Sequence, residues 1–182
     1  MKFFVLRHAK HNYNISYKYT DKGLVDKAKA DLNLLIPKLK KLEIISLIAS
    51  FTTRSQETAL IIREKLQLPC LITLSDFDPL GLPRGEKWKI IQKLKSDTGK
   101  SWQELWLQNK CIGMEPPIAF LNRLELAIGR IKHYLKKGNV LLIAHEETVW
   151  GLNVLLNNKT WAEAIQIQVL PASLHNFNII IT

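Results

Sequence analysis

Two arginines and two histidines, all able to bind or attack a phosphoryl group, follow short apolar runs in the sequence. Arg7 and His8 follow the first run, Arg54 lies a few residues after the second, and His145 ends the most apolar one. An arginine guanidinium binds phosphate oxygens through a planar pair of donors and stays charged at physiological pH. A neutral imidazole can act as a nucleophile and form a covalent intermediate. If these side chains converge, they form a compact cationic pocket suited to phosphoryl chemistry.

The elements that must position these residues alternate between short apolar runs and amphipathic segments. Such alternation indicates an α/β layer architecture. In an open α/β sheet, ligands bind at the carboxyl ends of parallel strands, near a switch in strand order. We therefore predict a three-layer α/β/α sandwich with a mostly parallel sheet, in one domain spanning residues 1–182. The expected strands are residues 3–6, 44–49, 70–74 (an edge strand), 139–144 and 173–181.

The helices that should cover this sheet are indicated by apolar residues at helical spacing. One is expected to begin near Thr20 and Asp21, with Thr20 as its cap, and to be interrupted or restarted at Pro37. Residues 76–86 are rich in proline and glycine and should form a loop. The other expected helices are 53–66, two or three between 88 and 137, and 147–156.

The remaining histidines and the cysteines show no placement that indicates chemistry. His11, His133 and His175 do not end an apolar run, so we expect structural or surface roles for them. Cys70 and Cys111 have neither metal-ligand nor redox spacing, which argues against a disulfide framework or a zinc site. We therefore predict reduced thiols, no metal site and no cofactor.

The chain carries a formal net charge of +10. Its lysines are spread over helical segments and are not gathered beside exposed aromatic residues, and no nucleic-acid-binding motif is present. We therefore expect a solvated basic surface that steers anionic substrates, and no specific nucleic-acid partner. No apolar run approaches the roughly 20 residues that span a membrane, and Arg7 ends the first run too early for a signal peptide. These features predict a cytoplasmic protein without a membrane partner.

Several blocks of the sequence, taken in order, resemble the signatures of the histidine phosphatase superfamily, whose fold is also called phosphoglycerate-mutase-like. Each block lies at or near the end of an expected strand or the start of an expected helix, and together they span roughly residues 3–156. Ala9, where the family usually has glycine, resembles the small phosphohistidine-phosphatase branch. The blocks are Val5-Leu6-Arg7-His8-Ala9, Thr20-Asp21-Lys22-Gly23, Ser50-Phe51-Thr52-Thr53-Arg54-Ser55-Gln56-Glu57-Thr58-Ala59 and Val140-Leu141-Leu142-Ile143-Ala144-His145.

The resemblance implies a mechanism that needs no metal or cofactor. His8 would attack phosphorus in line, while Arg7, Arg54 and His145 would hold the equatorial oxygens. Asn14 lies where the family often has a phosphate-contacting asparagine. Phosphoryl transfer depends mainly on positioning and charge neutralisation, both of which such a pocket supplies. A carboxylic acid would protonate the leaving oxygen and then activate the water that hydrolyses phosphohistidine.

The carboxylic acid has more than one candidate in this sequence. The family's Leu-x-Glu-x-x-x-Gly is similar to the segment from Leu74 to Gly81, which offers Asp76 and Asp78 in place of the glutamate. Either aspartate could instead only cap a turn. We predict that the donor is one of this pair, and Glu86 is a weaker candidate.

Two further carboxylates follow the second histidine, where many members have glycine or asparagine. Glu146 and Glu147 would lie close to bound phosphate and would repel it unless they are protonated or turned away. Either could alternatively be the proton donor, because the phytase-like branch carries an acid just after this histidine. We assign Glu147 provisionally to substrate binding.

The leading functional hypothesis is hydrolysis of phosphomonoesters, or of phosphohistidine, in a small phosphorylated substrate or a phosphoprotein. Two alternatives stay open. One is a phosphoglycerate-type mutase, although the family's mutases resemble longer chains. The other is a catalytically weak module that binds phosphate or a phosphoprotein. The sequence does not indicate the oligomeric state.

Overall fold

In the computed structural model, which describes residues 1–12, 22–81 and 85–179, five strands form a mostly parallel sheet with the order β5-β4-β6-β1-β7. Strands β1, β4, β5 and β6 run parallel, whereas β7 pairs antiparallel with β1. A separate two-stranded ladder joins β2 to β3. The strands are β1 (Phe3–Arg7), β2 (His11–Asn12), β3 (Lys22–Leu24), β4 (Ile44–Ala49), β5 (Leu71–Thr73), β6 (Asn139–Ala144) and β7 (Leu174–Phe177).

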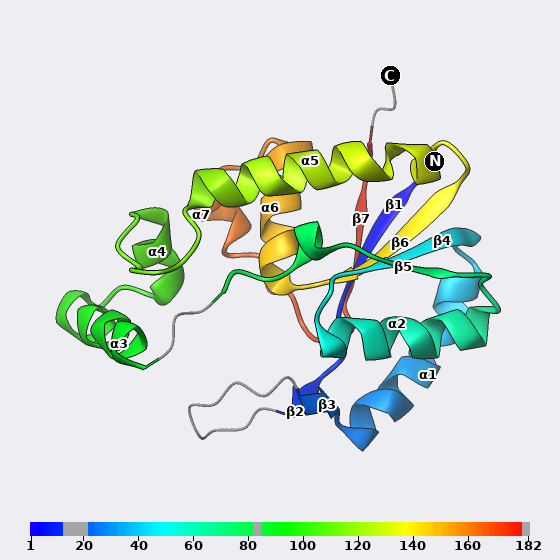
Figure 1. Cartoon of the computed structure of the whole chain (residues 1–182), viewed down its shortest axis with the longest axis horizontal. Helices are drawn as coiled ribbons and strands as arrows, with labels where there is room; N and C mark the ends of the chain where they lie inside the picture. The colour runs from blue at the N-terminus through cyan, green and yellow to red at the C-terminus, as the bar shows by residue number, and fades with distance from the viewer. Residues whose placement is uncertain (13–21, 82–84, 180–182) are drawn as a thin grey trace.

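Helices cover both faces of the five-stranded sheet, so the predicted three-layer sandwich is confirmed (Figure 1). Helices α1 and α2 lie on one face, and α5 and α6 lie on the other, while α3 and α4 stand at one end of the molecule. The helices are α1 (Asp26–Lys40), α2 (Thr53–Leu66), α3 (Glu86–Thr98), α4 (Trp102–Leu107), α5 (Pro117–Leu135), α6 (Glu146–Asn157) and α7 (Trp161–Ala164), with a 3₁₀ turn, η1, at Ser75–Phe77.

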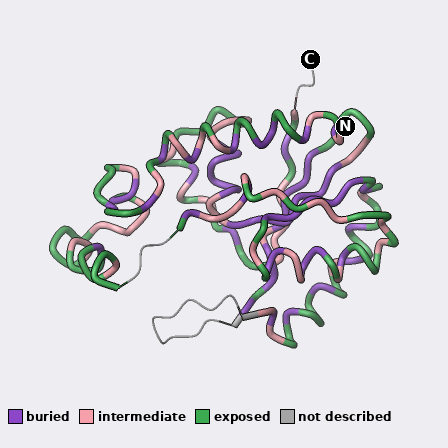
Figure 2. The backbone as a smooth tube through the Cα atoms, viewed as in Figure 1, coloured by how far each residue is buried: buried purple, intermediate pink, exposed green. Residues whose placement is uncertain are grey.

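The two faces of the sheet belong to two apolar cores because successive strand side chains point in opposite directions. In β1, Phe4 and Leu6 belong to the core shared with α1 and α2, whereas Phe3 and Val5 belong to the core shared with α5 and α6. Both faces are covered, so the central strands consist almost wholly of apolar residues. Figure 2 shows the buried strands between outward-facing, exposed helix surfaces.

The predicted start of the first helix is wrong. Lys22–Leu24 forms strand β3, which pairs with β2, and α1 begins only at Asp26. Residues that helical spacing had assigned to the first turn of the predicted helix therefore pair with the backbone of His11–Asn12. Thr20 and Asp21, the predicted cap, lie outside the described residues.

Pro37 does not interrupt α1, contrary to our prediction. The residue lies inside the helix on its exposed side, where the carbonyl that loses its backbone donor can face water. Ile36 and Leu39, on either side of it, are buried in the core shared with α2. Packing of this apolar face holds the last turn in helical form despite the missing hydrogen bond.

The outer strands are shorter than the sequence indicated. Strand β5 is an edge strand of three residues, and β7 pairs with β1 only over Leu174–Phe177. Residues 180–182, part of the predicted last strand, are not described. Across the described parts of the chain, no helix has the length and apolar character that a membrane crossing requires.

Candidate active site

The sheet order brings the carboxyl ends of β1, β4 and β6 together. Strand β6 lies between the other two, and its last residues accept hydrogen bonds from both neighbours. The His8 N–H donates to the Ala144 carbonyl at 2.9 Å, and the Ser50 N–H donates to the Ile143 carbonyl at 3.0 Å. His145 follows Ala144 directly. The residues after all three strands therefore share one edge of the sheet, at the switch in strand order where α/β folds bind ligands.

Arg54 connects the two histidines predicted from the sequence. Its Nε donates to His8 Nε2 at 3.1 Å, and its Nη2 donates to His145 Nδ1 at 3.3 Å. The centroids of the two imidazole rings are 5.1 Å apart. All three side chains are buried, with at most 5% of their surface exposed. The structure thus brings together three of the residues that the sequence singled out.

His8 is held as a neutral imidazole whose Nε2 lone pair accepts from Arg54. Its Nδ1 lies 2.8 Å from the Ala9 carbonyl, which can only accept, so Nδ1 carries the proton and Nε2 carries the lone pair. Burial lowers the pKa of His8 to about 3, with further lowering by Arg54, His11 and Arg7. The Nε2 atom is therefore unprotonated throughout the physiological pH range.

His145 is held in the opposite tautomer. Its Nδ1 faces Arg54, which can only donate, so Nδ1 accepts and Nε2 carries the proton. Nε2 donates to Ser50 Oγ, which lies 2.8 Å away. Burial, together with the neighbouring His8 and the two arginines, Arg54 and Arg7, holds the pKa of His145 well below its usual value. The side chain is thus a neutral group inside a cationic pocket.

Arg7, at the end of β1, keeps one donor without a partner. Its Nη1 donates to the Val169 carbonyl and lies 3.3 Å from Glu146 Oε2. Its Nε is buried and has no hydrogen-bond partner within residues 1–12, 22–81 and 85–179. Buried donors are nearly always satisfied in native proteins, so this nitrogen is an exception among the described residues.

Thr58 ties the turn after His8 to helix α2. Its hydroxyl accepts from the Ala9 N–H at 3.1 Å and donates to the Arg54 carbonyl at 2.8 Å. One buried side chain therefore sets the distance between the residues that follow the first strand and the first turn of α2. This contact accounts for a threonine four positions after Arg54.

The β2–β3 ladder is held against α2 through Glu57. The Glu57 carboxylate accepts from the Leu24 N–H at 2.6 Å and passes so close to Gly23 that a Cβ there would lie 2.3 Å from it. A side chain at position 23 would therefore push the Glu57 carboxylate away from its place beside Leu24. His11, in the same ladder, is buried with its ring 5.1 Å from that of His8.

The two loop aspartates have different surroundings. Asp78 Oδ1 accepts from the Phe51 N–H at 2.6 Å, beside the turn that carries Arg54, and burial raises the pKa of Asp78. Asp76 instead forms an ion pair with Arg130, whose Nη1 donates to both carboxylate oxygens, at 2.9 and 2.8 Å. Only Asp78 is linked to the residues that follow β4.

Glu146 and Glu147 lie in the first turn of α6, where a carboxylate interacts favourably with the helix dipole. Burial raises the pKa of Glu146, while Arg7 opposes the rise. Burial and the neighbouring Glu146 raise the pKa of Glu147, against the effect of Arg7 and Arg54. Both carboxylates therefore hold a proton more readily than an exposed glutamate.

Two other predicted residues are not part of this arrangement as described. Asn14 lies outside the described residues. Glu86 begins α3 with its side chain 81% exposed, and it pairs with Lys89. His11, for which the sequence predicted a structural or surface role, is buried with its ring next to that of His8. The sequence analysis overlooked Arg123 on α5, which binds the backbone of the loop that carries Asp78.

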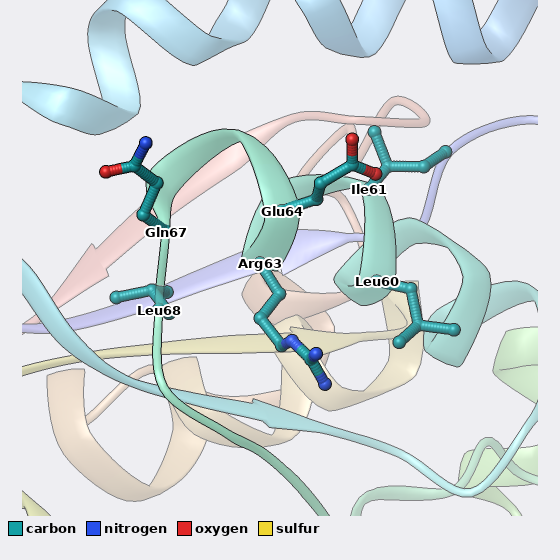
Figure 3. A pocket seen from close by; sticks show the side chains of 6 residues that line it. All are labelled: Leu60, Ile61, Arg63, Glu64, Gln67 and Leu68. Carbon is teal, nitrogen blue, oxygen red and sulfur yellow. The ribbon is translucent and has the colours of Figure 1, made fainter.

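A hollow lies along the later turns of α2 (Figure 3), whereas Arg54 lies in the first turn of that helix. None of the predicted site residues lines it, and its surface combines aliphatic side chains with one arginine, one glutamate and one glutamine. Among the described residues, no three His, Cys, Asp or Glu side chains form a group that could hold a metal ion. The residues that line the hollow are Leu60, Ile61, Arg63, Glu64, Gln67 and Leu68.

The sequence pattern of the histidine phosphatase superfamily (branch 1) matches residues 3–180. The chain belongs to this superfamily. Membership supports phosphatase or mutase activity. Comparison with curated proteins gives no match.

Solved structures of the superfamily share the fold at low sequence identity. A phosphoglycerate mutase from Bacillus anthracis strain Sterne is 23% identical, with 96% of this chain and 86% of that chain covered and a TM-score of 0.75. YhfR from Bacillus stearothermophilus is 16% identical, with 98% and 91% covered and a TM-score of 0.79. A mycobacterial glucosyl-3-phosphoglycerate phosphatase is 17% identical, with 96% and 88% covered and a TM-score of 0.76.

The depressed pKa of His8 predicts a pH dependence of stability. Between pH 6.5 and about 3, the unfolded chain binds a proton at His8 that the folded chain does not. The free energy of unfolding therefore falls as the pH falls, by about 1.4 kcal/mol per pH unit from this group. Urea denaturation at pH 6.5 and at pH 5 measures this change. Between these two pH values, the free energy of unfolding of His8→Asn should fall by about 2 kcal/mol less than that of wild type. Equal losses in the two proteins would contradict the buried, neutral state of His8.

Proposed function

We propose that this chain is a metal-independent phosphatase that hydrolyses phosphomonoesters, or phosphohistidine, through a covalent phosphohistidine at His8. One observation carries the proposal. The Ala9 carbonyl holds the proton of His8 on Nδ1, so Nε2 carries the lone pair and lies 3.1 Å from Arg54 Nε, a donor that can bind a phosphate oxygen. A nucleophile needs that lone pair, and the low pKa of His8 keeps it available at neutral pH.

In the first step of the proposed reaction, the Nε2 lone pair of His8 forms a bond to phosphorus. The bond from phosphorus to the ester oxygen breaks, and its electron pair stays on that oxygen. Asp78 gives the leaving oxygen a proton, so the products are phosphohistidine, an alcohol and the Asp78 carboxylate. The Ala9 carbonyl, already bound to Nδ1–H, stabilises the positive charge that develops on the imidazole.

In the second step, the Asp78 carboxylate takes a proton from water as the water oxygen attacks phosphorus. The bond from phosphorus to Nε2 of His8 breaks, its electron pair returns to the imidazole, and inorganic phosphate leaves. Burial supports this double role, because it raises the pKa of Asp78 and so brings it nearer to the pH at which the group can both give and accept a proton.

The oxygens of the transferring group would be bound by donors that are already in place. Arg54 lies between the two histidines, and the unpartnered Nε of Arg7 is a further donor. Helices α2 and α6 both begin at this edge of the sheet, and helix amino termini favour anions. A bound dianion would also offset the cationic surroundings of His145 and favour a second proton on that ring, which could then hold an oxygen.

The substrate class can be tested by measuring phosphate release from sugar phosphates, nucleotides, phosphohistidine and phosphoserine peptides. We expect turnover of several monoesters, with full activity in the presence of a chelator. A strict requirement for Mg²⁺ would contradict the mechanism. Binding of phosphate without turnover of any compound would favour the alternative of a phosphate- or phosphoprotein-binding module.

A mutase would give a different result with the phosphoglycerates. Incubation with 3-phosphoglycerate and 2,3-bisphosphoglycerate would then yield 2-phosphoglycerate faster than inorganic phosphate. Our proposal predicts the reverse, with inorganic phosphate released faster than 2-phosphoglycerate is formed.

The proposed proton donor predicts a selective effect on the leaving group. p-Nitrophenolate leaves readily without a proton, whereas an alkoxide needs one in the transition state. Asp78→Asn should therefore slow alkyl phosphates by about 100-fold or more and p-nitrophenyl phosphate far less. Asp76→Asn is the matched control, because Asp76 lies in the same turn and binds Arg130.

The two glutamates of α6 provide the opposing outcome. If Glu146→Gln or Glu147→Gln shows the selective loss of alkyl phosphate hydrolysis and Asp78→Asn does not, the acid beside the second histidine is the donor.

A further inference from the structure

Arg123, on helix α5, binds the backbone of the turn that carries Asp78. Its Nη1 donates to the carbonyl of Asp76 at 2.7 Å and to the carbonyl of Asp78 at 3.0 Å. Its Nε and Nη2 donate to the two carboxylate oxygens of Glu115, at 3.0 and 2.6 Å. Four N–H donors of one guanidinium are therefore used, two on the turn and two on an anchor that precedes α5.

The other backbone hydrogen bonds of the turn are local: the Asp78 N–H donates to the Ser75 carbonyl at 2.9 Å, and the Phe77 N–H donates to the Leu74 carbonyl at 3.2 Å. Between the carbonyls of Asp76 and Asp78, the Phe77 carbonyl accepts from Thr148 Oγ1 at 3.5 Å, the limit of a hydrogen bond. The buried Phe77 ring holds the turn to the core, but a ring in a core does not set the direction of the next side chain. The contacts of Arg123 fix the turn more directly, because they hold the carbonyl of the peptide before Phe77 and the carbonyl of the peptide after Asp78.

We propose that Arg123, held by Glu115, is the positioning residue that aims the Asp78 carboxyl at the leaving oxygen. This inference rests on the proposed function, in which Asp78 is the proton donor. The Asp78 carboxyl is then held at two points, through its backbone by Arg123 and through Oδ1 by the Phe51 N–H. General acid catalysis depends steeply on such alignment, so a small rotation of the turn slows the steps that need a proton.

An arginine suits this role and a lysine does not. The planar guanidinium reaches the Glu115 carboxylate with one edge and the two carbonyls with another, whereas an ammonium is a single point of charge. Arg123→Lys therefore keeps the positive charge near Asp78 but loses the simultaneous hydrogen bonds to the Glu115 carboxylate and to the two carbonyls of the turn. The matched control is Arg130→Lys, because Arg130 lies on the same helix and binds the same turn, but only through the Asp76 side chain.

The test compares kcat for an alkyl phosphate and for p-nitrophenyl phosphate in wild type, Arg123→Lys, Glu115→Gln and Arg130→Lys. We expect Arg123→Lys to slow the alkyl phosphate on the order of 10- to 100-fold and p-nitrophenyl phosphate no more than about threefold. Glu115→Gln, which removes the anchor's charge, should give a smaller loss of the same selectivity. Arg130→Lys should change both substrates equally or not at all.

A double variant separates positioning from general structural damage. If Arg123 acts through Asp78, then Arg123→Lys should cost almost nothing further in the Asp78→Asn background. Additive losses, or equal losses for both substrates in Arg123→Lys, would overturn the inference. If Asp78→Asn selectively slows alkyl phosphate hydrolysis and Arg123→Lys does not, the inference about Arg123 is wrong and the proposed function stands. Absence of any turnover by wild type would overturn the proposed function and the inference with it.

Discussion

His8→Ala should remove essentially all turnover of phosphomonoesters, and with it any phosphoenzyme that survives quenching in base. Alanine has no lone pair to attack phosphorus, and water in the vacated space would lack the alignment that the buried imidazole provides. We expect kcat to fall by several orders of magnitude, as when other enzymes lose a nucleophile. Steady-state kinetics with p-nitrophenyl phosphate measures the loss.

The control for this substitution is His133→Ala, which removes an exposed histidine from α5 and should leave kcat unchanged. Retention of more than a few per cent of kcat by His8→Ala would mean that another group attacks phosphorus. A base-stable, acid-labile phosphoenzyme in that variant would lead to the same conclusion, with His145 as the next histidine to examine.

Arg54→Lys should lower kcat by about two or more orders of magnitude. The guanidinium of Arg54 contacts both His8 and His145, so it lies where charge on the transferring oxygens is redistributed in the transition state. A lysine supplies the charge but cannot reproduce donors that point in two directions from one plane. The effect should therefore exceed any change in ground-state affinity, and kcat should fall more than KM rises.

Arg63→Lys provides the matched control for this second prediction. Arg63 lies on the same helix as Arg54, but its side chain is exposed beside the hollow on the later turns. We expect its kinetics to equal those of wild type. A change in Arg54→Lys that is confined to KM would contradict a role for Arg54 in the transition state.

The positions of His8, Arg54 and His145 could be predicted because they depend on features that a sequence shows directly. Each follows an apolar run long enough for a buried strand, and carboxyl ends of parallel strands meet at one edge of the sheet. The orientation of the side chains could not be predicted in the same way. The tautomer of His8, for example, depends on the carbonyl of the next residue, Ala9.

The segments that were wrongly predicted depend on contacts between distant parts of the chain. Lys22–Leu24 has helix-compatible residues, yet it forms a strand because His11 and Asn12 offer backbone partners and Glu57 binds Leu24. Sequence periodicity contains no information on such pairings. Pro37 was predicted to interrupt the first helix for a related reason. Burial of the neighbouring apolar side chains stabilises the helix by more than the one lost hydrogen bond costs, and the local sequence does not show that burial.

The choice between Asp76 and Asp78 was equally beyond the sequence. Both lie in one short loop, and their surroundings differ only because Arg130 pairs with the first and the Phe51 N–H binds the second. Arg123 looked like an ordinary surface charge on an amphipathic helix. Its position next to Leu124 and three residues after Phe120, both of the buried stripe, was the available signal that it could reach inward.

The stereochemical course at phosphorus tests the central claim, a covalent phosphohistidine, most directly. A phosphorothioate monoester made chiral at phosphorus with oxygen isotopes would be hydrolysed in water of the third isotope, and the configuration of the product determined. Attack by His8 followed by attack of water comprises two in-line displacements, each of which inverts phosphorus, so the account predicts overall retention. Overall inversion would mean that water attacks the substrate directly, and it would contradict the account.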